Sequence, residues 1–162
     1  MIAPYRPCEG ALAWASGYTS PEMAWRECIQ GDWMLWIIGK VSGGTPYSDA
    51  RKRLVLCACE CSRMALPYPE DMRLEVAIDT IERWARGDAT TEELREVRAI
   101  IDFSPPLCAV CYSADSAIAE SATFAALSVA GARGLIGRKV FPVCADIVRK
   151  HYPDPPIPER NQ

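Results

Sequence analysis

The sequence predicts an all-α fold, a single compact bundle of about seven or eight helices. Three observations predict this class. Apolar residues recur at spacings of three and four through most of the 162 residues, which is the period of an amphipathic helix. Glycine and proline divide the chain into segments of helical length, and no pair of segments has the alternation of a β-hairpin. We expect one domain over 1–153 and a proline-rich tail over 154–162.

The first two expected helices have clear boundary signals. A short helix covers 8–18. The next begins with Ser20 as N-cap and Pro21 at the first helical position, where proline is favoured. Gly31 is the expected end of that helix.

A third helix is expected to follow at once, over 31–44. Asp32 is placed to cap it, because a carboxylate can accept hydrogen bonds from the free N–H groups of the first turn. Trp33, Trp36 and Ile37 fall on one stripe, so we expect them to face the core.

The helix expected over 48–66 is amphipathic. Its charged side carries Asp49, Lys52, Glu60 and Arg63. Its apolar side is expected to contain the following residues: Leu54, Cys57, Ala58, Cys61, Met64 and Ala65.

Three thiols occur within five residues of that helix. At 3.6 residues per turn Cys59 points about 160° away from Cys57 and Cys61, so the three cannot bind one metal ion together. We expect core thiols, because free cysteine is a small and usually buried apolar residue. A structural zinc site is the alternative, and it would need Cys57 or Cys61 to meet Cys108 and Cys111.

The helix over 72–88 has the most regular pattern. Acidic residues precede arginines by four positions in two pairs, Asp79 with Arg83 and Glu82 with Arg86, and each pair is worth about 0.3–0.5 kcal/mol. Gly87 is expected to close the helix. Its apolar stripe consists of Leu74, Ala77, Ile78, Ile81 and Ala85.

Three more helices are expected in the C-terminal half. The first opens with a capping box from Thr90 to Glu93 and places Leu94, Val97 and Ile101 inward. The second is a long Ala/Ser-rich helix over 107–134, whose small side chains let neighbours approach closely, so we expect it at the centre. The last covers 140–152, with Phe141, Cys144, Val148 and Tyr152 inward.

Charge excludes some functions and favours others. The net charge of −3 argues against direct nucleic-acid binding, which usually needs a basic excess. No apolar run is long enough to span a membrane, and no secretory signal is visible, so a cytoplasmic location is expected. The segment 70–102 carries ten acidic residues against five arginines, which predicts an acidic surface suited to a basic partner.

Catalytic motifs are missing from the sequence. The chain has one histidine, which leaves no conventional metal cluster and no Ser-His-Asp or Cys-His arrangement. The sequence has no GxGxxG, no GxxxxGKS and no HExxH. We expect no enzyme activity, no catalytic residue, no bound metal and no cofactor.

Several stretches, in order along 8–153, resemble an all-α family of immunity proteins from bacterial polymorphic toxin systems, with related proteins in phages. The most specific are "GDWMLW", "ERWARG" and "ADIVR". The resemblance implies a helical protein that acts by binding and has no catalytic activity. The family pattern falls on Asp32, Trp33, Asp71, Arg73, Glu82, Trp84, Arg86, Asp146 and Arg149. We expect scaffold roles for Asp32, Trp33, Trp84, Asp146 and Arg149.

The leading hypothesis is therefore an inhibitor that neutralises a toxin by direct contact. A phage-encoded inhibitor of a host defence complex, such as an anti-CRISPR protein, is the alternative, and a zinc-stabilised accessory protein is a second. The expected partner-binding residues are Asp71, Arg73, Glu75, Asp79, Glu82, Arg86, Glu93 and Glu96.

Overall fold

The computed structural model describes residues 2, 5–41, 48–64, 72–101 and 137–156. Within these ranges it contains seven α-helices and no β-strand, which confirms the all-α class. None of the described helices is both long enough and apolar enough to cross a membrane. The Ala/Ser-rich segment 107–134 lies outside the described residues, so the expected central helix stays a prediction.

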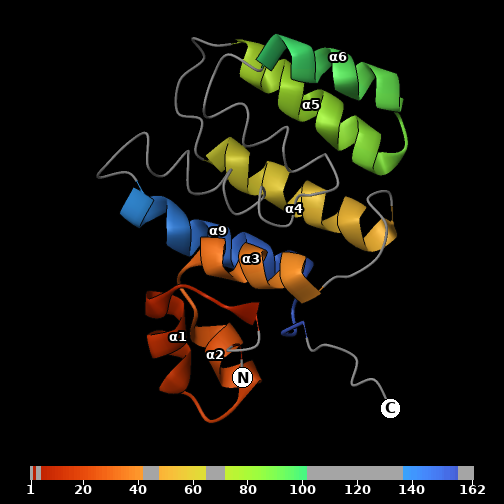
Figure 1. The fold of residues 1–162 in the computed structure, drawn as a ribbon. Coiled ribbons are helices and arrows are strands. Elements are labelled where there is room, and N and C mark those ends of the chain that lie inside the picture. The colour runs from red at the N-terminus through yellow and green to blue at the C-terminus, as the bar shows by residue number, and fades with distance from the viewer. Residues whose placement is uncertain (1, 3–4, 42–47, 65–71, 102–136, 157–162) are drawn as a thin grey trace.

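The described helices stack in layers (Figure 1). The layers consist, in order, of α5 (Met72–Arg86) with α6 (Thr91–Ile101), then α4 (Asp49–Met64), then α3 (Gly31–Val41) with α9 (Gly137–His151), and last α1 (Glu9–Ser16) with α2 (Pro21–Glu27). α4 contacts α5 on one side and both α9 and α3 on the other, while α6 packs on α5. α4 is therefore an inner layer of the described stack.

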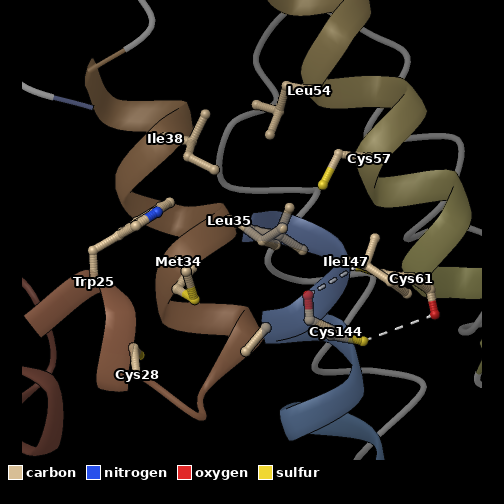
Figure 2. Packing of buried hydrophobic residues seen from close by; sticks show 12 residues of the cluster. Trp25, Cys28, Met34, Leu35, Ile38, Leu54, Cys57, Cys61, Cys144 and Ile147 are labelled. Atoms are coloured by element: carbon tan, nitrogen blue, oxygen red, sulfur yellow. Dashed lines mark hydrogen bonds between the residues drawn. The ribbon is translucent and has the colours of Figure 1, made fainter. Parts of the chain in front are cut away.

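This position explains the three neighbouring thiols. Cys57 and Cys61 belong to the cluster that α4 forms with α3 and α9, shown in Figure 2. Cys59 belongs to a second cluster, formed with α5, and has no exposed surface. Cys59 therefore points away from Cys57 and Cys61, as the helix period predicts, but the side that it occupies is buried too, because α4 is covered on two opposite sides. Met64, expected to face the core, is 52% exposed at the end of α4.

The contact between α3 and α9 is very close at Gly31. A Cβ atom at this position would lie 2.5 Å from the Cβ atom of Cys144 and 2.7 Å from the backbone nitrogen of Ala145. Gly31 was expected to end the second helix, but α2 ends earlier, where Cys28 takes an extended conformation. Gly31 instead begins α3, and its missing side chain lets α9 approach.

Three other expected boundary signals are present. Ser20 caps α2 by accepting a hydrogen bond from the N–H of Met23. Thr90 and Glu93 form the capping box of α6, with reciprocal bonds of 2.7 and 3.2 Å. Gly87 has a φ of 91° and forms a Schellman turn after α5. Local sequence therefore sets these helix boundaries.

The described cysteines are all free thiols, and only Cys8 is exposed. Burial raises the pKa of Cys28 above its ordinary value. The hydrogen bond with Cys61, together with burial, raises the pKa of Cys144. No group of three or more metal-binding side chains occurs in the described ranges. Cys108 and Cys111 lie outside them, so the zinc alternative is not tested.

We expect Gly31→Ala to lower the free energy of unfolding by about 2–3 kcal/mol, because the added methyl group meets backbone atoms that cannot move aside. Urea denaturation measures the effect. Gly17→Ala is the matched control, since Gly17 has a φ of −75° and a Cβ there would have only ordinary contacts. A loss for Gly31→Ala no larger than for the control would contradict the close approach of α3 and α9.

Alkylation of the native protein should distinguish Cys8 from the other described thiols. Only the thiolate reacts with iodoacetamide, and burial both hides a thiol and disfavours its ionisation. We expect Cys8 to be modified far faster than Cys57, Cys59 or Cys61, as followed by peptide mass spectrometry. Equal rates in the folded protein would show that α4 is not buried on both sides.

Candidate functional site

The expected partner-binding residues that the structure describes lie on the outer hairpin, α5 and α6. Asp71 lies outside the described residues, and Arg73 belongs to the first turn of α5. Of the others, one group forms ion pairs with the described part of the protein and a second group does not. The first group contains Asp79, Glu82, Arg86 and Glu93.

Arg63 of α4 organises the carboxylates of α5. Its guanidinium pairs with Asp79, and its Nε atom donates to an oxygen of Glu82 at 3.0 Å. The second oxygen of Glu82 is 3.4 Å from Arg86, as expected for that pair. The expected pair of Asp79 with Arg83 is not formed. Sequence spacing could not predict the role of Arg63, because this residue lies on α4 and contacts α5 only in the folded protein.

Glu93 has a structural role at the start of α6. Its carboxylate accepts hydrogen bonds from the backbone N–H and the hydroxyl of Thr90 and pairs with Arg83 at 3.2 Å. These bonds, the one from the Thr90 backbone first, lower the pKa of Glu93. Replacing Glu93 would therefore disturb the helix itself.

Glu75 and Glu96 differ from these residues. Both are exposed, and neither forms an ion pair with the described part of the chain. α5 and α6 are antiparallel and joined by the pair of Arg83 with Glu93, so Glu75 lies near the open end of the hairpin and Glu96 lies near the middle of α6. A partner could contact these two carboxylates without displacing an ion-pair partner that belongs to the described part of the chain.

Arg149 connects α9 to the end of α2. It pairs with Asp146 at 2.6 Å. Its other terminal nitrogen donates to the carbonyl oxygens of Cys28 at 2.7 Å and Trp25 at 3.3 Å. Arg149 therefore attaches the end of α2 to α9. Trp84 is also structural, since only 4% of it is exposed, within the cluster between α4 and α5.

Asp32 does not cap α3 as expected. It lies one residue inside the helix and is 4% exposed, and its Oδ1 atom has no hydrogen-bond partner among the residues that the structure describes. Burial raises the pKa of Asp32, although hydrogen bonds from the backbone N–H groups of Trp33 and Asp32 oppose this shift. A buried carboxylate with a free oxygen weakens the fold when it is ionised.

An apolar pocket of about 210 Å³ lies at the other end of the stack. The expected core stripe of α3 forms one wall, because Trp33, Trp36 and Ile37 are only half-buried and line this cavity. The sequence predicted the apolar stripe but not the pocket that this stripe lines. The remaining walls come from α1, α2, the N-terminal residues and the C-terminal segment, and include Tyr5, Ala11, Trp14, Ala15, Ala24, Trp25, Pro155 and Pro156.

Comparison of the chain with protein-family models, with curated proteins and with solved structures gives no match. Two surfaces of the described chain are therefore the basis for functional inference. One is the outer hairpin with Glu75 and Glu96, and the other is the indole-lined pocket beside α3.

The pH dependence of stability should reveal the buried carboxylate. The raised pKa means that the folded protein binds this proton more tightly than the unfolded chain. Ionisation then costs the folded state free energy above the folded-state pKa, and the cost is absent below the pKa of the unfolded chain. We expect Asp32→Asn to gain stability relative to the wild type as the pH rises from about 4 to 7. Urea unfolding at several pH values measures this, and a constant difference would contradict it.

Proposed function

We propose that this chain is a non-catalytic inhibitor that binds a protein partner in the cytoplasm through the outer face of α5 and α6. The observation that carries the proposal is that Glu75 and Glu96 are exposed and form no ion pair with the described part of the chain, while neighbouring carboxylates are paired within it. The resemblance of the sequence to immunity proteins supports the inhibitory role and suggests a toxin as partner.

The charge of this face indicates the chemistry of the partner. Between residues 75 and 97 the sequence has seven carboxylates and three arginines. A basic surface complements this charge and would be drawn to it before contact. Nucleases and nucleoprotein complexes carry such surfaces, because they must bind phosphate. An inhibitor that covers a basic groove would block the substrate directly.

The hairpin is also well placed and well fixed for binding. It forms the outer layer of the described stack, on the side away from α1 and α2 (Figure 1). The ion pairs of Arg63 with Asp79 and Glu82 attach α5 to α4. Val76 is 54% exposed on this hairpin and supplies apolar area next to Glu75. A rigid, mixed surface loses little conformational entropy when it binds.

A second partner class shares this chemistry. A phage-encoded inhibitor of a host defence complex would use the same acidic face, since such a complex also exposes a nucleic-acid groove. The resemblance includes phage proteins, which favours this alternative. Identification of the captured partner separates the two.

The test is an affinity pull-down from the host, followed by association kinetics with the captured partner. We expect the double variant Glu75→Lys with Glu96→Lys to associate about tenfold more slowly at low ionic strength, because charge attraction speeds encounter. Its association should also depend less on salt. The matched control is Glu9→Lys with Glu27→Lys, which changes the net charge equally on α1 and α2.

Equal association rates for the two double variants would move the interface away from α5 and α6. Failure of the full chain to retain any protein above a scrambled control would contradict a binding function. Neither double variant replaces Glu93 or Glu82, so the hydrogen bonds that hold the hairpin stay intact.

A further inference from the structure

We propose that the pocket lined by Trp14, Trp33 and Trp36 is a binding site for a small uncharged aromatic molecule of one or two rings. This proposal is independent of the acidic face, because the pocket lies among α1, α2 and α3 at the opposite end of the stack. It rests on the size of the cavity, on the chemistry of its walls and on its position between two parts of the fold.

The cavity has a volume of about 210 Å³. A dry cavity of about 150 Å³ with aliphatic and aromatic walls is sufficient for benzene. Three alanines of the adjacent helices, Ala11, Ala15 and Ala24, line the space with short side chains and leave it unfilled. One or two aromatic rings therefore fit without movement of the backbone.

The walls select an uncharged ring. Every described residue that lines the pocket is uncharged, so none of them could supply a counter-ion to a charged ligand that had lost its water shell. Trp14 and Trp33 are already tilted against each other at 55°, with ring centroids 6.0 Å apart. Aromatic rings favour such tilted contacts, and a third ring could join this pair in the same way.

The C-terminal segment shows which groups this wall accepts. Pro155 and Pro156, which are uncharged and cyclic, lie half-buried on the pocket wall. They follow Tyr152, whose carbonyl accepts a hydrogen bond of 2.9 Å from Trp25 Nε1. This bond leaves the indole ring of Trp25 fixed and its polar atom satisfied, so the pocket presents aromatic carbon to a ligand.

The position of the pocket predicts what binding would do. α1 and α2 lie on one side of it and α3 on the other. The described hydrogen bonds that hold α2 to the rest of the fold run to α9 and to the residue after it: Arg149 donates to the end of α2, and Trp25 donates to the carbonyl of Tyr152. A ligand that contacts both sides would add apolar contact area to the junction and would stabilise the folded chain by mass action.

Indole is the probe, and thermal unfolding of the full chain is the first measurement. At ten times its dissociation constant, indole should raise the Tm of the wild type by about 3–5 °C. Ala15→Phe fills the cavity from α1 and should abolish this rise. Ala13→Phe is the matched control, because Ala13 is exposed on the same helix, and it should keep the rise.

Nuclear Overhauser effects in the wild type give a second, independent test. Indole protons should show contacts to the methyl groups of Ala15 and Ile37, which line opposite sides of the cavity. This measurement decides the proposal even if Ala15→Phe does not fold. Absence of both the Tm rise and these contacts at millimolar indole would overturn it, as would an equal rise in Ala15→Phe and Ala13→Phe.

Discussion

The described structure depends on the burial of α4 on two opposite sides. The cluster with α5 removes one side from water, and the cluster with α3 and α9 removes the other. A helix with only one apolar stripe could not hold both layers, because each layer would need the same surface. Cysteine suits this position, since it is apolar enough for burial and short enough to let both neighbours approach.

Close approach is repeated where α9 crosses the described core. Cys61 and Cys144 lie side by side, and each sulfur atom is 3.9 Å from the carbonyl oxygen of the other residue. On the side of α3, the absence of a side chain at Gly31 likewise lets α9 approach closely. Arg149 then extends the assembly to α2 by binding its terminal carbonyl groups. The layers are thus connected by packing of buried residues and by directed bonds between helices, from Arg63 to α5 and from Arg149 to the end of α2.

The charged side chains of the hairpin perform two different tasks. Asp79 and Glu82 attach α5 to α4 through Arg63. Glu93 caps the start of α6 and pairs with Arg83 of α5. Counting charges in the sequence does not reveal these structural roles. Glu75 and Glu96 are exposed and form no ion pair with the described part of the chain, so they are the carboxylates assigned to the proposed partner. An acidic sequence segment is therefore only partly an acidic binding surface. The pocket at the other end has apolar walls instead, so the two proposed sites differ in chemistry and can be tested separately.

The sequence by itself determined the helical class and most local boundaries. The Ser20 cap, the capping box at Thr90 and the turn at Gly87 follow from hydrogen bonds between residues a few positions apart. The buried stripe of α5 follows from the helical spacing of its apolar residues, Ala77, Ile78, Ile81 and Ala85. Such features need no knowledge of distant segments.

Tertiary structure alone decided which layers meet. Periodicity shows that a helix has an apolar side, but it does not show a second buried side such as that of Cys59. Nor does periodicity show that Asp79 pairs with Arg63 of α4 and not with Arg83. It also does not show that Asp32 is buried or that Trp33 and Trp36 line a pocket. Each of these depends on residues far apart in the chain, whose positions are fixed only when the helices pack.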